Sequence, residues 1–174
     1  MRSASAILIF IAVSSLGMAE MPEPLIQQAP IAETEPAMLP RPILIHIVRN
    51  SGQIFSGTVL QVEHHNSNSS STLATTTVRF RVDEAIRGVQ KGQVLNIKEW
   101  AGLWQAGRER YRPGERVLLF LYPLSKLGLT SPVGRSGRFA VDRTGYVVIK
   151  HHPRGVSMRE MRRMVRAIRQ REAE

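Results

Sequence analysis

The residues best suited to ligand binding cluster in the middle of the chain. Both tryptophans lie four residues apart, and arginines with one tyrosine follow them. Indole faces and guanidinium groups stack on ring-shaped groups and bind anions. Presented on a loop between two strands, this set predicts a binding site for a sugar, a peptide or an anionic polymer. Its members are Trp100, Trp104, Arg108, Arg110, Tyr111 and Arg112.

The same residues also have a structural interpretation, which carries more weight because an exposed tryptophan leaves a large apolar surface in water. A spacing of four suits one helical turn packed on a core. The tryptophans would then close one end of the domain, and the arginines would lie in solvent.

Paired histidines are the only candidates for metal binding. His64 and His65 end one predicted strand, and His151 and His152 end another. Imidazole is the commonest transition-metal ligand among side chains. Neighbours in a strand point to opposite faces, so each pair supplies one ligand, from His64 and His151 for example. No cysteine or suitably spaced carboxylate completes such a site, and the favoured interpretation is that these residues are solvated strand ends.

Motifs of nucleophilic catalysis and phosphate binding are missing from the sequence. No serine lies in a Gly-x-Ser-x-Gly turn, and no glycine-rich phosphate loop occurs. We therefore expect a non-enzymatic binding module without a cofactor. The alternative is a metal-dependent or hydrolytic enzyme that uses the paired histidines.

Alternating apolar residues predict the strands that position these groups. In the clearest strand Val78, Phe80 and Val82 alternate with Arg79 and Arg81. Elsewhere, Leu60 and Val62 are predicted to point inward together, as are Leu95 and Ile97, and 117–122 is apolar throughout, as in a strand covered on both faces. The predicted strands are 54–64, 76–83, 94–100, 117–122, 138–142 and 146–151.

Two helices are considered. Residues 157–171 begin with Ser157 and Glu160 in a capping box and carry an apolar stripe, which predicts a C-terminal helix. Its many arginines suit an anionic membrane or a polyanion, although an ordinary helix docked on the domain is favoured. Residues 43–51 fit a helix or a strand, with a preference for a short helix.

The N-terminus predicts export. Residues 1–19 have a positive start, an apolar run from Ala4 to Val13 and small residues before a cleavage point after Ala19. An uncleaved anchor is disfavoured because polar residues interrupt the run. Residues 20–42 contain six prolines and predict an extended linker. The folded domain is expected over 43–174, secreted or periplasmic, with no transmembrane segment after cleavage.

Composition restricts the partners. Residues 43–174 hold 22 of the 24 Lys and Arg but 10 of the 14 Asp and Glu, a net charge of +12. Such a domain attracts polyanions, unless the arginine usage is only compositional. The partner is thus an unknown protein or an anionic envelope polymer; export disfavours nucleic acid. The chain has no cysteine, so the domain folds without a disulfide.

Residues 78–88, 92–97 and 111–120 resemble the strand pattern of the netrin-like and TIMP-like modules. That resemblance implies a small OB-like β-barrel of five to six antiparallel strands, here with a C-terminal α-helix; strand spacing alone fits a barrel or a sandwich. The modules' cysteines are missing, so metalloprotease inhibition is not implied. Residues 99–104 and 127–133 are also similar to uncharacterised secreted bacterial proteins, which implies a shared domain.

Overall fold

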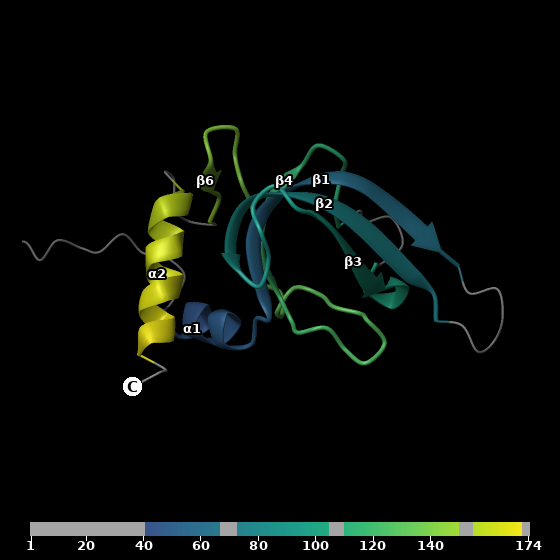
Figure 1. Cartoon of the computed structure of the whole chain (residues 1–174), viewed down its shortest axis with the longest axis horizontal. Coiled ribbons are helices and arrows are strands. Elements are labelled where there is room, and N and C mark those ends of the chain that lie inside the picture. Colours follow the sequence, from purple (N-terminus) through teal and green to yellow (C-terminus); the bar gives the residue numbers. More distant parts are fainter. Residues whose placement is uncertain (1–40, 67–72, 105–109, 150–154, 172–174) are drawn as a thin grey trace, which may run out of the picture. The chain divides into compact units, whose positions relative to one another are not determined.

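The main element of the structure is a five-stranded antiparallel sheet with the strand order β3-β2-β1-β4-β5 (Figure 1). The structure is a computed structural model and describes residues 41–66, 73–104, 110–149 and 155–171. A small second sheet pairs β6 with β7. The elements are α1 (Arg41–Arg49), β1 (Gln53–His65), β2 (Thr75–Arg87), β3 (Val94–Trp100), the 3-10 helix η1 (Ala101–Leu103), β4 (Arg116–Leu121), β5 (Arg138–Ala140), β6 (Tyr146–Val147), β7 (Val156–Ser157) and α2 (Met158–Gln170).

This architecture confirms a mainly β protein with a C-terminal helix. The predicted signal peptide, and the predicted linker up to residue 40, lie outside the described residues. Of residues 43–51, those up to Arg49 lie in helix α1 rather than in a strand, and α1 begins at Arg41 because Pro42 is compatible with the first turn of a helix. Among the described helices, none has the length and apolarity needed to cross a membrane.

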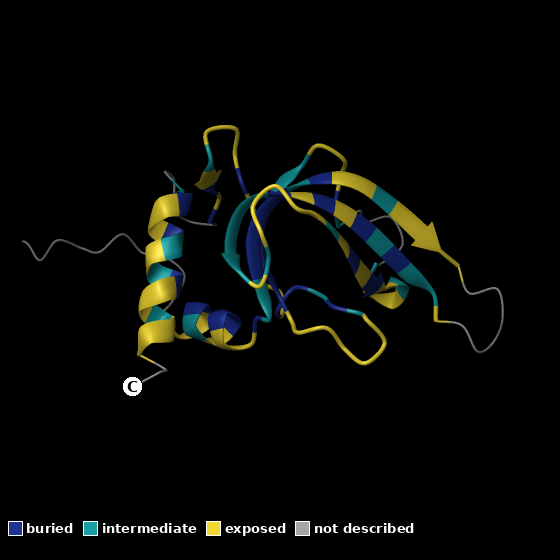
Figure 2. Cartoon of the chain, viewed as in Figure 1, coloured by how far each residue is buried: buried dark blue, intermediate teal, exposed yellow. Residues whose placement is uncertain are grey.

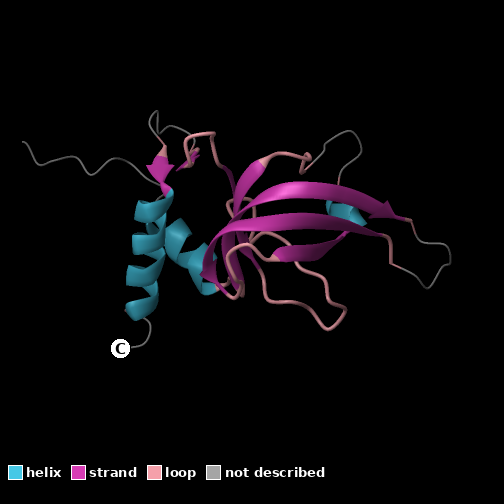
Figure 3. Ribbon diagram, turned by 45° about the horizontal axis from the view of Figure 1, so that its top comes forward, coloured by secondary structure: helices cyan, strands magenta, loops and turns pink. Residues whose placement is uncertain are grey.

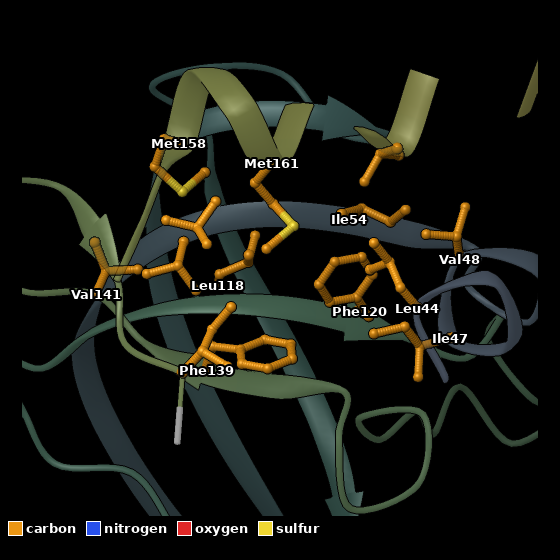
Figure 4. Packing of buried hydrophobic residues seen from close by; sticks show 14 of the residues in the cluster. Leu44, Ile47, Val48, Ile54, Leu118, Phe120, Phe139, Val141, Met158 and Met161 are labelled. Atoms are coloured by element: carbon orange, nitrogen blue, oxygen red, sulfur yellow. The ribbon is translucent and has the colours of Figure 1, made fainter. Parts of the chain in front are cut away.

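The sheet separates two hydrophobic clusters, and β4 contributes to both because it is buried on both faces. Val117, Leu119 and Leu121 join the cluster that contains Phe80 and Tyr111. Leu118 and Phe120 point the other way, toward the helices (Figure 4). The prediction of a strand covered on both faces is therefore confirmed.

Both helices cover the cluster that contains Leu118 and Phe120, and they contact each other (Figure 3). The stripe of α2 buries Met158, Met161 and Val165. Ser157 Oγ accepts a hydrogen bond of 3.2 Å from the Glu160 amide, which caps the helix as predicted. The favoured interpretation of a docked amphipathic helix is confirmed for its apolar side.

No closed barrel occurs in the described residues. However, one segment after β4 contacts both β3 and β4, two strands that are not neighbours in the sheet. The Thr130 amide donates a 2.9 Å hydrogen bond to the carbonyl of Lys98 in β3. The next residue, Ser131, accepts a 3.0 Å bond from the Tyr122 amide at the end of β4. This segment, residues 129–133, thus links edge strand β3 to β4.

Candidate binding site

The two tryptophans flank one helical turn but lie in different environments. Trp100 is the last residue of β3, and η1 connects it to Trp104, whose amide bonds the carbonyl of Ala101 at 2.9 Å. Trp100 leaves 48% of its surface exposed. Its ring lies directly against Gly102, where a Cβ atom would come within 2.4 Å of it. Trp104 is half-buried and packs inward.

Trp104 joins a group of aromatic rings, of which Tyr111 and Phe80 are buried and His64 is exposed. Its ring meets that of Tyr111 with centroids 5.8 Å apart and that of His64 edge to face at 5.2 Å. Tyr111 is 2% exposed and also contacts Phe80 edge to face. The guanidinium of Arg138 lies 5.2 Å from the centre of the Tyr111 ring, within the range of a cation–π contact. Trp104 and Tyr111 therefore belong to the core at this end of the sheet.

A buried carboxylate lies at the centre of this group. Glu99 has no exposed surface, and Trp104 Nε1 donates to its Oε2 at 2.9 Å. The Tyr111 hydroxyl donates to Oε1 at 3.2 Å, and Arg110 approaches Oε2 at 3.4 Å. Both carboxylate oxygens thus have a partner, as buried polar atoms require. We call Glu99, Trp104, Arg110 and Tyr111 the Glu99 network.

Burial sets the proton affinity of the network. It raises the pKa of Glu99, and the neighbouring Arg110, Tyr111 and Trp104 counteract that rise only in part. Burial, followed by the charge of Glu99, also raises the pKa of Tyr111. Since Glu99 is enclosed by side chains, the network is suited to fixing the end of β3 and η1 rather than to contacting a substrate.

One sequence signal could have predicted the burial of Glu99. Leu95 and Ile97 were predicted to point inward, and Glu99 continues that alternation. A carboxylate at an inward strand position needs donors, and Trp104, Arg110 and Tyr111 were already candidates on other grounds. The structure brings these three together and leaves Trp100 and Arg112 exposed. Arg108 lies outside the described residues.

The neighbouring histidines His64 and His65 also lie in different environments. His64 Nδ1 lies 3.0 Å from Thr76 Oγ1, and His65 Nε2 lies 3.1 Å from Thr77 Oγ1. Thr76 is buried whereas Thr77 is not, so the neighbouring histidines point to opposite faces, as expected. His151 and His152 lie outside the described residues. In the described part of the chain, no three His, Cys, Asp or Glu residues come close enough to bind a metal ion.

Trp100 shares a solvent-exposed sheet face with several basic and polar residues. Antiparallel pairing places it opposite Thr75, Lys98 opposite Thr77 and Asn96 opposite Arg79. Residues paired in this way project on the same side of a sheet. Every second residue of β2 and β3 on this side is exposed or half-buried, and those between are mostly buried (Figure 2). We call this surface the outer basic face; it consists of Thr75, Thr77, Arg79, Arg81, Val94, Asn96, Lys98 and Trp100.

The sequence matches no protein-family model, and no curated protein or solved structure is significantly similar to it.

Proposed function

We propose that this protein is an exported, non-enzymatic binding module whose outer basic face binds an anionic, sugar-containing polymer of the cell envelope. The observation that carries the proposal is the register of β2 and β3. It aligns the half-exposed ring of Trp100 with the cations Lys98, Arg79 and Arg81 along one side of the sheet. Exposed aromatic rings stack on sugar rings or other flat groups, and the cations attract the negative charges.

The composition of the face supports a polymer rather than a folded protein as the ligand. Besides Trp100, its only large apolar residue is Val94. Protein–protein interfaces contain little lysine, and their buried centres are apolar. A row of three cations, two threonine hydroxyls and one amide beside one aromatic ring suits a repeating polar chain instead.

The proposed domain is an OB-like barrel that segment 129–133 completes. Two features support this: the segment contacts both β3 and β4, and the strand pattern resembles the netrin-like modules. In barrels of this type an open sheet face and its loops bind extended ligands.

Export is proposed from residues 1–19, and it favours envelope polymers over nucleic acids as the ligand. The histidine-based enzyme lacks a supporting observation in the described residues, where His64 contacts Thr76 and meets the Trp104 ring edge to face.

Tryptophan fluorescence tests the proposal, because the chain has only two tryptophans. The probes are phosphomannan and polygalacturonate, with uncharged mannan as the control polymer. Anionic polymer should shift the emission of the processed protein, and the variant Trp100→Phe should lose most of that shift. Trp100→Ala should weaken binding roughly tenfold, as for the loss of one stacking contact.

Tyr146→Ala is the matched control, because Tyr146 is an exposed ring (43%) outside this face. Equal losses for Trp100→Ala and Tyr146→Ala, or no binding of either anionic polymer, would overturn the proposal. Capture of a folded protein partner through the same face, without polymer binding, would overturn it as well.

A further inference from the structure

An open hollow of about 500 Å³ lies beside the outer basic face. One row of paired residues runs through it: Arg81 of β2 lies opposite Thr58 of β1, which lies opposite Arg116 of β4. Asp83 follows two residues after Arg81 on β2. The turn that carries Lys91 and Gly92 completes the lining, and backbone bonds between this turn and Val82 fix its position.

The charges in the hollow do not balance. Asp83 is its one carboxylate, and Thr58 Oγ1 donates to it at 2.7 Å. Arg81 Nε lies 3.4 Å from Oδ1 of Asp83, and Arg116 Nε lies 3.6 Å from its Oδ2. Within the described residues the Lys91 side chain has neither a hydrogen bond nor an ion pair. Three cations therefore face one anion, and the hollow carries an excess of two positive charges.

The donors of this hollow are only partly used. Arg81 is 58% exposed and Arg116 37%, whereas Asp83 is 18% exposed. Each guanidinium presents five N–H donors in a fixed fork, which matches the oxygens of a phosphoryl group, and a lysine adds a mobile point charge. A tetrahedral oxyanion offers acceptors in several directions and so can contact cations from different strands at once.

We propose that this hollow is the subsite for a phosphate group of the polymer, which rests on the proposed function of the outer basic face. Arg81, Arg116 and Lys91 bind the phosphoryl oxygens. Asp83 orients both arginines and is not itself a contact to the ligand. Among anionic polymers, this subsite thus favours those that carry phosphate.

The geometry also sets a minimum length for the ligand. Arg81 lies opposite Val94, six residues before Trp100 on β3. At about 3.3 Å per residue, the two subsites are roughly 20 Å apart. A ligand that contacts both must be an extended chain of several units, and a small anion reaches the hollow alone.

The first experiment uses inorganic phosphate and the amide NMR spectrum of the processed protein. Phosphate should shift the amides of Arg81, Lys91, Gly92 and Arg116 at millimolar concentrations, and acetate should shift them less. Lys91→Ala should weaken phosphate binding about two- to fivefold, the effect of one exposed charge contact. Arg163→Ala on α2 removes the same charge from an exposed position elsewhere and should have no effect.

The second experiment separates this inference from the proposed function. Wild-type protein should bind phosphomannan more tightly than polygalacturonate; Lys91→Ala should reduce this preference about two- to fivefold, whereas Trp100→Ala should weaken the binding of both polymers. If phosphate shifts no amide of the hollow, or shifts the arginines of α2 equally, the subsite is wrong. The proposed function then survives if polymer binding still depends on Trp100. If phosphate binds in the hollow but no polymer binds, the subsite stands as an isolated anion site and the proposed function fails.

Discussion

Trp104 donates a hydrogen bond of 2.9 Å to Glu99, a carboxylate without exposed surface, across the turn that separates the two tryptophans. This bond explains why Trp104 points inward while Trp100 remains exposed. It also makes the Glu99 network a structural support for the end of β3, on which the position of Trp100 in the outer basic face depends.

Replacing Trp104 should destabilise the protein far more than replacing Trp100. Trp104→Phe retains most of the ring packing but removes one donor from a buried carboxylate, which costs about 1–3 kcal/mol. Trp100→Phe changes an exposed side chain and should stay within about 0.5 kcal/mol of wild type. Urea denaturation measures both free energies of unfolding, and equal losses would contradict the structural role of Trp104.

Ionisation of Glu99 should lower stability as the pH rises. Burial raises the pKa of Glu99 above its usual 4.5, so the folded state binds this proton more tightly than the unfolded state. The contribution of Glu99 to the free energy of unfolding is therefore largest below about pH 4.5 and falls as the pH increases through the folded-state pKa. The slope in that interval is at most about 1.4 kcal/mol per pH unit.

Glu99→Gln removes the titration of this group, and the cost of placing an amide NH2 among the donors Trp104, Tyr111 and Arg110 offsets the two stabilities by an amount independent of the Glu99 proton. Hydrogen bonds from the Tyr146 amide and from Thr144 lower the pKa of Asp142, which changes stability with pH in the opposite direction. Asp142 is present in both proteins, so its contribution cancels in the comparison. The stability of wild type relative to the variant should decline as the pH rises from about 4.5 through the folded-state pKa of Glu99. A constant difference across this range would show that burial does not control the proton of Glu99.

Gly137→Ala tests the segment after β4. A Cβ atom at residue 137 would lie 2.3 Å from the amide nitrogen of Val133 and 2.9 Å from the carbonyl oxygen of Phe120. Both contacts are with backbone, so the chain must move and the bonds between this segment and β4 are lost. We expect a loss of several kcal/mol or failure to fold, about the range of severe single substitutions.

Gly134→Asn is the control for that variant. Gly134 has a φ of 58° with open space around it, a conformation that asparagine tolerates. It should fold with nearly wild-type stability by thermal denaturation. If Gly137→Ala is equally harmless, segment 129–133 does not pack against β4 as described.

Met161→Ala tests the docking of α2. Met161 is 1% exposed within the cluster that joins both helices to β4, and truncating a buried methionine costs about 2–5 kcal/mol. Arg163→Ala changes an exposed residue of the same helix and should cost less than about 0.5 kcal/mol. Comparable values for the two variants would mean that the helix is not held on the sheet through this stripe.

Much of the fold could be predicted because strand alternation is a local signal. Val78, Phe80 and Val82 are buried as their spacing indicates, and a turn with Gly145 at a φ of 87° separates the predicted strands 138–142 and 146–151. Leu60 shows where this signal fails. It was expected to point inward but is 40% exposed, because the register of β1 against β2 shifts between Val59 and Gln61.

The candidate site was harder to predict because it depends on pairing between distant segments. The sequence grouped Trp100 with Trp104, Arg110 and Tyr111, which are its neighbours along the chain. Strand register instead groups it with residues of β2, and only the pairing of β2 with β3 reveals that surface. Likewise, Glu99 carries no motif, and its burial follows from packing of side chains brought in from other segments.

The salt dependence of polymer binding tests the central claim most directly. The variant Arg79→Ala/Lys98→Ala removes two charges from the outer basic face, and Arg163→Ala/Arg166→Ala removes two exposed charges from α2. Affinity for phosphomannan is measured over a series of salt concentrations. The account predicts that the first variant weakens binding and reduces the log–log salt slope by about two, whereas the second leaves both nearly unchanged. Equal effects of the two variants would show that net charge alone attracts the polymer and would contradict a specific binding face.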